Sequence, residues 1–163
     1  MLGNTYSGQV CSIARSLELI GERWTILILR DAFLGVRRFD DFQRSLGVAR
    51  NVLQGRLERL AEGGILERVR YQERPERFEY RLTEKGLDLW PVVVALLSWG
   101  DKHASPGGAP VVLEHRGCGG HVNDRRICEA CGALLGPRDV SARRGPALAE
   151  AEPADVVQPA LAG

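Results

Sequence analysis

The sequence has no long apolar run and no excess of charge of either sign. Its formal net charge is +1 over 163 residues, so bulk charge selects neither a nucleic acid nor a membrane surface as a partner. The longest apolar stretch, residues 89–99, falls well short of the roughly 20 residues that a membrane helix needs. The first nine residues lack the charged and apolar segments of a secretory signal. We therefore expect no membrane contact and a cytoplasmic location.

Lysine and cysteine are both scarce. Lys85 and Lys102 are the only lysines among 22 basic residues. Arginine is the side chain best suited to phosphate and guanine recognition, although a GC-rich genome produces the same bias. The four cysteines are Cys11, Cys118, Cys128 and Cys131. In a cytosolic chain they indicate metal ligands or reactive thiols before disulfides.

Sequence motifs of catalysis are missing as well. The chain contains no G-x-S-x-G, no H-E-x-x-H and no P-loop, so we expect a protein that is not an enzyme. Its 44% apolar and 26% charged residues are typical of a soluble, folded chain. The length suits one domain with a small appendage. The expected units are an arm at 1–9, a domain at 10–104, a linker at 105–110, an appendage at 111–136 and a disordered tail at 137–163.

Four segments of the expected domain have helical periodicity. The first, residues 10–20, ends at Gly21, and the second, residues 24–33, is apolar on more than one face and hence buried. The third and fourth, residues 39–46 and 49–62, are joined by a tight turn at Gly47. Two consecutive helices joined in this way are a candidate helix-turn-helix.

Residues 65–82 change to the two-residue period of β-strands on either side of a charged loop at 72–77. A helix-turn-helix followed by a hairpin is a winged helix. The predicted fold class is therefore mainly α with a small β-hairpin. A helix at 83–103 follows, with Thr83 as its cap and a bend at Pro91.

The helix at 83–103 has two apolar stripes. They consist of Leu87, Trp90, Val94 and Leu97, and of Leu89, Val93 and Leu96. One stripe can cover the core of the winged helix. We expect the other to pair with the same helix of a second copy, which makes the protein a homodimer.

Several motifs of this region resemble the HxlR family of bacterial transcriptional regulators, relatives of the MarR-like winged helices. They are Cys11–Arg30, Arg38-Phe-Asp-Asp-Phe42, Leu53–Leu60 and Pro75–Thr83. The resemblance implies a homodimeric regulator, a repressor or an activator, that binds a double-stranded DNA operator. Its recognition helix would be 49–62 and its wing 72–77. The family usually has serine where this chain has Ala49, so a helix cap and a phosphate contact are missing here.

The outward face of the predicted recognition helix suits the edges of bases. Arginine pairs with guanine, whereas asparagine and glutamine pair with adenine. The candidate DNA contacts are Arg50, Asn51, Gln54 and Arg56 of this helix, Arg74 and Arg77 of the wing, and Arg38 before the helix-turn-helix. Residues 37–81 hold 11 arginines and 8 acidic residues, a surplus too small to identify a DNA-binding protein by itself. The alternative is that these side chains are ordinary solvated residues.

Cys11 is a candidate redox sensor. It lies at the start of the first helix with Arg15 one turn on, and both features favour the thiolate. The resemblance implies that a cysteine at this position senses electrophiles or oxidants. Alternatively, Cys11 is a small buried residue, and the signal is a small-molecule effector or none.

The appendage has the spacing of a short zinc ribbon. His115-x2-Cys118 and Cys128-x2-Cys131 are two pairs of ligands, and a glycine follows the second member of each pair. Four protein ligands make a structural site, since no position stays open for catalysis. His121 is an alternative fourth ligand, and three reduced cysteines or a Cys128–Cys131 redox pair are alternatives to zinc. DNA binding itself would require no cofactor.

Two other functions compete with DNA-binding regulation. A thiol redox protein could use Cys128 and Cys131, but no thioredoxin-like strand-to-helix pattern flanks the pair. A winged-helix adaptor that binds protein instead of DNA is the second. Glu73 and Glu76 in the wing and the missing cap at Ala49 are compatible with it.

Overall fold

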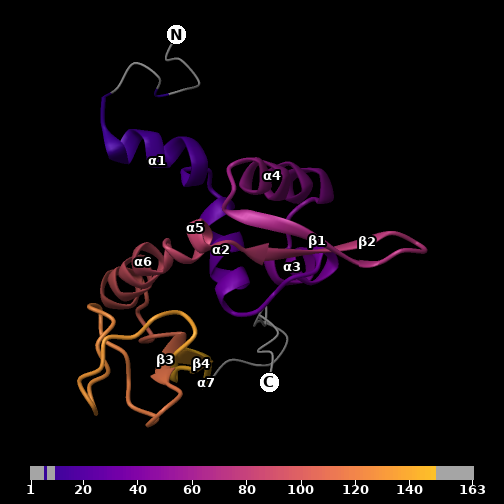
Figure 1. Cartoon of the computed structure of the whole chain (residues 1–163). Helices are drawn as coiled ribbons and strands as arrows, with labels where there is room; N and C mark the ends of the chain where they lie inside the picture. The colour runs from indigo at the N-terminus through magenta and orange to yellow at the C-terminus, as the bar shows by residue number, and fades with distance from the viewer. Residues whose placement is uncertain (1–5, 7–9, 150–163) are drawn as a thin grey trace.

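The computed structural model describes residue 6 and residues 10–149. Figure 1 shows a winged-helix unit with a small appendage packed beneath its last long helix. The winged-helix unit consists of α1 (Ser12–Ile20), α2 (Thr25–Phe33), α3 (Phe39–Leu46), α4 (Arg50–Glu62), β1 (Leu66–Gln72) and β2 (Arg77–Leu82). It continues into α5 (Glu84–Leu87) and α6 (Trp90–His103), and the appendage contains β3 (Val111–His115), β4 (Val140–Arg144) and α7 (Pro146–Ala149).

The core of the winged-helix unit lies between α2, α3 and α4. The three leucines of α4 that the helical period predicts to face inward, Leu53, Leu57 and Leu60, are buried. They pack with Ile28 and Phe42, both fully enclosed. Because one stripe of α4 is buried, its opposite face is exposed to solvent. This is the arrangement that a recognition helix requires.

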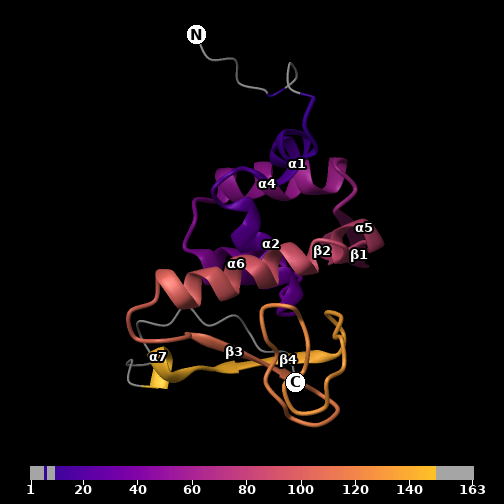
Figure 2. The same ribbon diagram turned by 90° about the vertical axis from the view of Figure 1, so that its left-hand side faces the viewer.

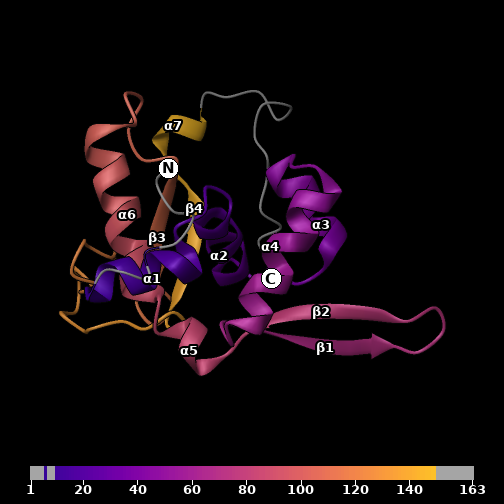
Figure 3. The ribbon, with the colours of Figure 1, turned by 90° about the horizontal axis from the view of Figure 1, so that it is seen from above.

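The wing is the antiparallel pair β1–β2, which runs from Leu66 opposite Leu82 to Gln72 opposite Arg77, with a shift of register between Arg70 and Gln72. It projects from the body of the molecule on the side away from α6 (Figures 1 and 3). The predicted hairpin is confirmed, but its loop is shorter than predicted and spans residues 73–76, because Gln72 and Arg77 belong to the strands. The observed fold is mainly helical with a small antiparallel hairpin, as expected.

The single helix predicted at 83–103 is wrong. Thr83 does cap a helix, since its hydroxyl oxygen accepts a hydrogen bond from the Gly86 N–H at 3.1 Å, but α5 ends at Leu87 and α6 begins at Trp90. Pro91 lies in the first turn of α6, where its missing N–H removes no intrahelical bond. The proline therefore opens a second helix instead of bending a continuous one.

The appendage lies against α6 (Figure 2). Its strands pair in antiparallel fashion, from Val111 opposite Arg144 to His115 opposite Val140. This pairing contradicts the predicted disordered tail at 137–163 for residues 137–149, because β4 and α7 belong to the folded appendage. The rest of that predicted tail lies outside the described residues, as does the predicted arm at 1–9 apart from Tyr6.

The appendage covers one apolar stripe of α6. Trp90 and Val94 are buried together with Leu113, Leu135 and Val140 of the appendage. Val93 and Leu89 of the other stripe pack on the winged-helix core. The prediction that the stripe left free by the core pairs with a second copy is therefore wrong, because the appendage of the same chain covers it. Among residues 10–149, no helix combines the length and the apolar character needed to cross a bilayer.

Candidate nucleic-acid interface and metal centre

The turn between α3 and α4 presents the start of α4 to solvent. Gly47 adopts a left-handed conformation with φ of 62°, and its N–H donates to the Gln43 carbonyl at 2.9 Å. Val48 is buried and anchors the turn. Ala49 has the extended backbone of a helix cap but makes no side-chain capping bond, so the N–H groups of the first turn keep their hydrogen-bonding capacity.

Arg50, Asn51 and Gln54 are exposed together on the first turns of α4. Arg50 reaches back to α3, where its Nη1 lies 3.1 Å from Gln43 Oε1 and 3.3 Å from Asp40 Oδ1. The Gln54 amide donates to Glu58 at 3.0 Å. Such exposed contacts are weak, so both side chains can exchange them for contacts to a ligand.

Arg56 does not share this surface. Its Nη2 lies 2.8 Å from Glu22 Oε2 and its side chain is 24% exposed, on the side of α4 that faces the loop between α1 and α2. The neighbouring Arg59 contacts the same carboxylate at 3.6 Å. The structure therefore gives Arg56 an internal partner and separates it from the other predicted contacts.

The wing carries exposed arginines. Arg74 and Arg77 are exposed at its far end. Arg38 packs against the wing, with its guanidinium carbon 4.8 Å from the centre of the Tyr71 ring and its Nε 3.8 Å from Glu79. Sequence analysis missed Arg70, whose guanidinium lies 3.4 Å from Glu76. The strand alternation gave no signal for it, because it places Arg70 on the same face as the buried Leu66.

Cys11 is exposed and forms the N-cap of α1. Its carbonyl accepts the first backbone hydrogen bond of the helix, from Arg15 N–H at 3.0 Å. The alternative that Cys11 is a small buried residue is therefore wrong. An exposed thiol at a helix start is accessible to reagents.

The four predicted metal ligands converge. The nitrogen and sulfur atoms of His115, Cys118, Cys128 and Cys131 all lie within 4.8 Å of one another. His115 Nδ1 is 3.3 Å from Cys118 Sγ and 3.4 Å from Cys131 Sγ, and Cys118 Sγ is 3.5 Å from Cys128 Sγ. His121, the alternative fourth ligand, is not in the cluster. The structure therefore places His115, and not His121, beside the three cysteines. The spacing in the sequence left this choice open.

Two tight turns hold the cysteines. Gly119 and Gly132, which follow Cys118 and Cys131, have φ of 72° and 74°, a conformation that glycine adopts without strain. The backbone N–H of Cys131 points at the sulfur of Cys128. It lowers the pKa of that thiol to about 6, with a further N–H from Ala130 and against the effect of burial. A thiolate is the form that binds a metal ion.

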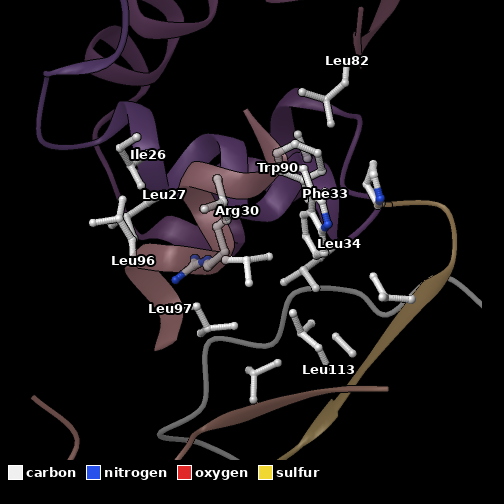
Figure 4. A pocket seen from close by; sticks show the side chains of 18 of the residues that line it. Ile26, Leu27, Arg30, Phe33, Leu34, Leu82, Trp90, Leu96, Leu97 and Leu113 are labelled. Carbon is white, nitrogen blue, oxygen red and sulfur yellow. The ribbon is translucent and has the colours of Figure 1, made fainter. Parts of the chain in front are cut away.

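A cavity of about 850 Å³ lies between α2, α6 and the β3–β4 sheet. Its wall is mostly apolar, as Figure 4 shows for Phe33 and Leu97. Arg30 also lines it, and its guanidinium contacts the buried Asp31 at 2.7 Å. The indole N–H of Trp90, another lining residue, is buried without a hydrogen-bond partner among the described residues.

An exposed helix after a tight turn, followed by a projecting hairpin, defines a winged helix-turn-helix protein. Residues 19–107 match the HxlR-like helix-turn-helix family, and the chain belongs to this family of transcriptional regulators. The resemblance noted in the sequence is confirmed.

Relatives support the same class. The HTH-type transcriptional regulators Mb3122 of Mycobacterium bovis and Rv3095 of Mycobacterium tuberculosis are each 48% identical over 89% of this chain and 91% of their own. An alignment of 146 residues extends past the family match and into the appendage. The regulator YdeP of Bacillus subtilis is 31% identical over 63% of this chain and 83% of its own.

Solved structures agree in fold. The crystal structure of PA1607, described as a transcription factor, is 39% identical, with a TM-score of 0.66 over 83% of this chain and 96% of its own. The reduced form of the redox regulator HypR is 30% identical, with a TM-score of 0.54 over 56% of this chain and 92% of its own. PA1607 therefore shares most of this chain, whereas HypR covers little more than half of it.

Proposed function

We propose that this protein is a homodimeric regulator that binds a DNA operator sequence-specifically. One observation carries the proposal. The leucine face of α4 is buried, while Arg50, Asn51 and Gln54 are exposed on its first turns beside a wing that projects from the body. A helix presented in this way fits the major groove, where its N-terminal residues reach the base edges.

Each candidate residue has its own role in this proposal. Asn51 and Gln54 read bases, because amide side chains can pair bidentately with adenine. Arg50 contacts a guanine or a phosphate after it leaves Asp40. Arg74 and Arg77 bind the flanking minor groove or its backbone, and Arg38 binds phosphate. We leave Arg56 out of the DNA surface because Glu22 already pairs with it.

Dimerisation follows from a second apolar face of α6. Val92, Leu96 and Trp99 are exposed at helical spacing. Val92 and Trp99 lie outside the cavity wall, whereas Leu96 also lines the cavity beside α2. Ile13 and Leu17 of α1 are exposed as well, and α1 and α6 lie on the same side of the molecule, opposite the wing (Figures 1 and 2). Pairing of these faces in a second copy would present two reading helices to one duplex.

Two routes for a signal are part of the proposal. The redox regulator HypR is similar in fold, and the exposed Cys11 is the thiol of this chain available to an oxidant outside the metal cluster. The cavity beside Trp90 suits an apolar effector that carries a hydrogen-bond acceptor for the unpartnered indole N–H. Repression, by occupation of a promoter in the cytoplasm, is the expected outcome of binding.

No cofactor is needed for DNA binding itself in this proposal. A structural zinc ion belongs to the appendage, because a tetrahedral site with three thiolates and an imidazole leaves no open position. The distances of 3.3, 3.4 and 3.5 Å between ligand atoms are close to those of such a site, and all four atoms lie within 4.8 Å of one another. Zn–S bonds of about 2.3 Å and Zn–N bonds of about 2.0 Å place the ligand atoms about 3.5 to 3.8 Å apart.

The test is a gel-shift titration on the DNA upstream of the protein's own gene. Asn51→Ala and Gln54→Ala should each reduce the preference for the operator over unrelated DNA by about 10-fold. Glu62→Gln, at the other end of α4, serves as the control and should leave that preference unchanged. If neither amide substitution alters sequence preference, α4 does not read bases.

The winged-helix adaptor is the competing function. It predicts that no duplex is shifted even at low salt, where non-specific DNA binding is strongest. A salt-dependent shift of the wild-type protein excludes it. A shift that is equal for all sequences removes sequence specificity from the proposal and leaves DNA binding.

A further inference from the structure

The appendage depends on very few apolar side chains. Across residues 111–145 its buried hydrophobic residues are Leu113, Cys128, Leu135 and Val140. The strands β3 and β4 are five residues each, and a two-stranded sheet is marginal in water. A unit of this size needs a further constraint such as a metal or a disulfide, and the structure has no disulfide among the described cysteines.

Cys128 connects the metal cluster to the core. Its side chain is 1% exposed and packs in the same apolar cluster as Trp90 and Val94 of α6. Cys118 and Cys131 are exposed. The cluster therefore has one side in solvent and one side, through Cys128, against the appendage–α6 interface.

The appendage–α6 interface shields the side chain of Trp90 from solvent. It is 5% exposed and its ring lies 5.2 Å from that of Phe33 on α2. Without the appendage, Trp90 and Val94 would form an apolar face on α6 in addition to the exposed face of Val92, Leu96 and Trp99. A helix with two exposed apolar faces can pair with a second copy through either face, so it does not specify a single dimer.

We infer that a zinc ion bound by His115, Cys118, Cys128 and Cys131 fastens the appendage over Trp90 and Val94. The metal thereby leaves α6 a single face, that of Val92, Leu96 and Trp99, for a second copy of the chain. This inference rests on the structural zinc and the homodimer of the proposed function. Thiolate and imidazole ligands in a closed tetrahedral set select zinc over magnesium or calcium, which prefer oxygen.

The first experiment measures zinc by plasma mass spectrometry in full-length protein purified without chelators. The expected content is about one zinc per chain. Cys118→Ser and His115→Ala should reduce it at least about 10-fold, whereas Cys11→Ser and His121→Ala, the matched controls, should retain it. Metal-free wild-type protein, or full retention by Cys118→Ser and His115→Ala, would overturn the site.

The second experiment measures whether removal of the metal exposes Trp90 to solvent. In a Trp24→Phe, Trp99→Phe variant, Trp90 is the one remaining tryptophan, and its fluorescence reports on the interface. Chelation should shift that emission to the red and increase its quenching by acrylamide, with far-UV helicity kept. Wild-type protein should then change from a dimer to larger, heterogeneous species in light scattering. Equimolar zinc should reverse these changes.

The two experiments test the zinc site, the fastening of the appendage and the pairing of two copies separately. If zinc leaves and Trp90 emission stays unchanged, the metal does not fasten the appendage, although the zinc site stands. Zinc-dependent Trp90 emission in a protein that shifts no DNA supports the fastening and contradicts only the proposed DNA binding. Zinc-loaded protein that is monomeric at micromolar concentration contradicts the role of the metal in pairing.

Discussion

Ala49 is the N-cap residue of α4 and makes no side-chain capping bond. Its backbone has φ of −60° and ψ of 141°, the geometry of a helix cap, and its methyl group can accept no hydrogen bond. We predict that Ala49→Ser stabilises the protein by about 1 kcal/mol, because the hydroxyl satisfies one N–H of the first turn. Urea unfolding measures the change. Ala49→Val, which has no acceptor, should give no gain, and equal midpoints for Ala49→Ser and the wild type would contradict the prediction.

Gly120 offers a test of the metal site that leaves all four ligands in place. A Cβ atom at this position would lie 2.6 Å from Cys128 Sγ and 2.6 Å from the Ala130 methyl. We predict that Gly120→Ala weakens zinc binding by about 10-fold or more, since the turn that carries Cys128 must move. Competition with a chromogenic zinc chelator measures the affinity. The control is Gly132→Asn, because its site is open and asparagine tolerates its positive φ.

At the scale of elements, the wing is expected to supply affinity without sequence preference. Arg74 is exposed at its tip, away from the reading helix. We predict that Arg74→Ala weakens binding to all duplexes alike and reduces the slope of log affinity against log salt by about 1, because one phosphate contact is lost. Arg138→Ala, an exposed arginine of the appendage beside Glu84, is the control and should leave the slope unchanged. A loss confined to the operator would instead make Arg74 a base-reading residue.

The elements that the sequence predicts well are those whose pattern is local and strong. Leu53, Leu57 and Leu60 repeat at helical spacing between a glycine turn and a glycine stop, and α4 has the predicted extent. β4 was missed because only Val140 in its five residues is β-branched. The strand forms because it pairs with β3, which ends at His115, far from the start of β4 at Val140 in the sequence. Non-local pairing of this kind leaves no periodic signal in a short strand.

The Cys/His cluster was predictable for a related reason. The cluster is visible as a local spacing in the sequence, with His115, Cys118, Cys128 and Cys131 as its members. The choice of His115 over His121 depends on how the two turns that carry the cysteines pack together. The internal partner of Arg56 was not predictable. Glu22 lies 34 residues away, and only the packing of the loop before α2 against α4 brings the two side chains to 2.8 Å.

For the whole molecule, the division of α6 into a covered and an uncovered face has the largest consequence. The appendage covers the Trp90 face, so the proposed homodimer uses the face of Val92, Leu96 and Trp99, which is exposed. This assigns the two halves of the chain different tasks. In the proposed function the winged helix contacts DNA, and in the further inference the appendage restricts how two winged helices can be joined.

Leu96→Glu tests this arrangement, because Leu96 is exposed on the uncovered face, at the edge that also lines the cavity. A buried carboxylate on each side of a two-fold interface costs several kcal/mol, so we predict a monomer in light scattering at micromolar concentration. The operator affinity should then fall more than about 100-fold, because the two half-sites are no longer bound by one linked molecule. Leu134→Glu, at an exposed leucine of the appendage, adds the same charge elsewhere and should leave both measurements unchanged. A Leu96→Glu protein that stays dimeric would place the interface on another surface, and a monomer that retains full operator affinity would show that recognition does not need two copies.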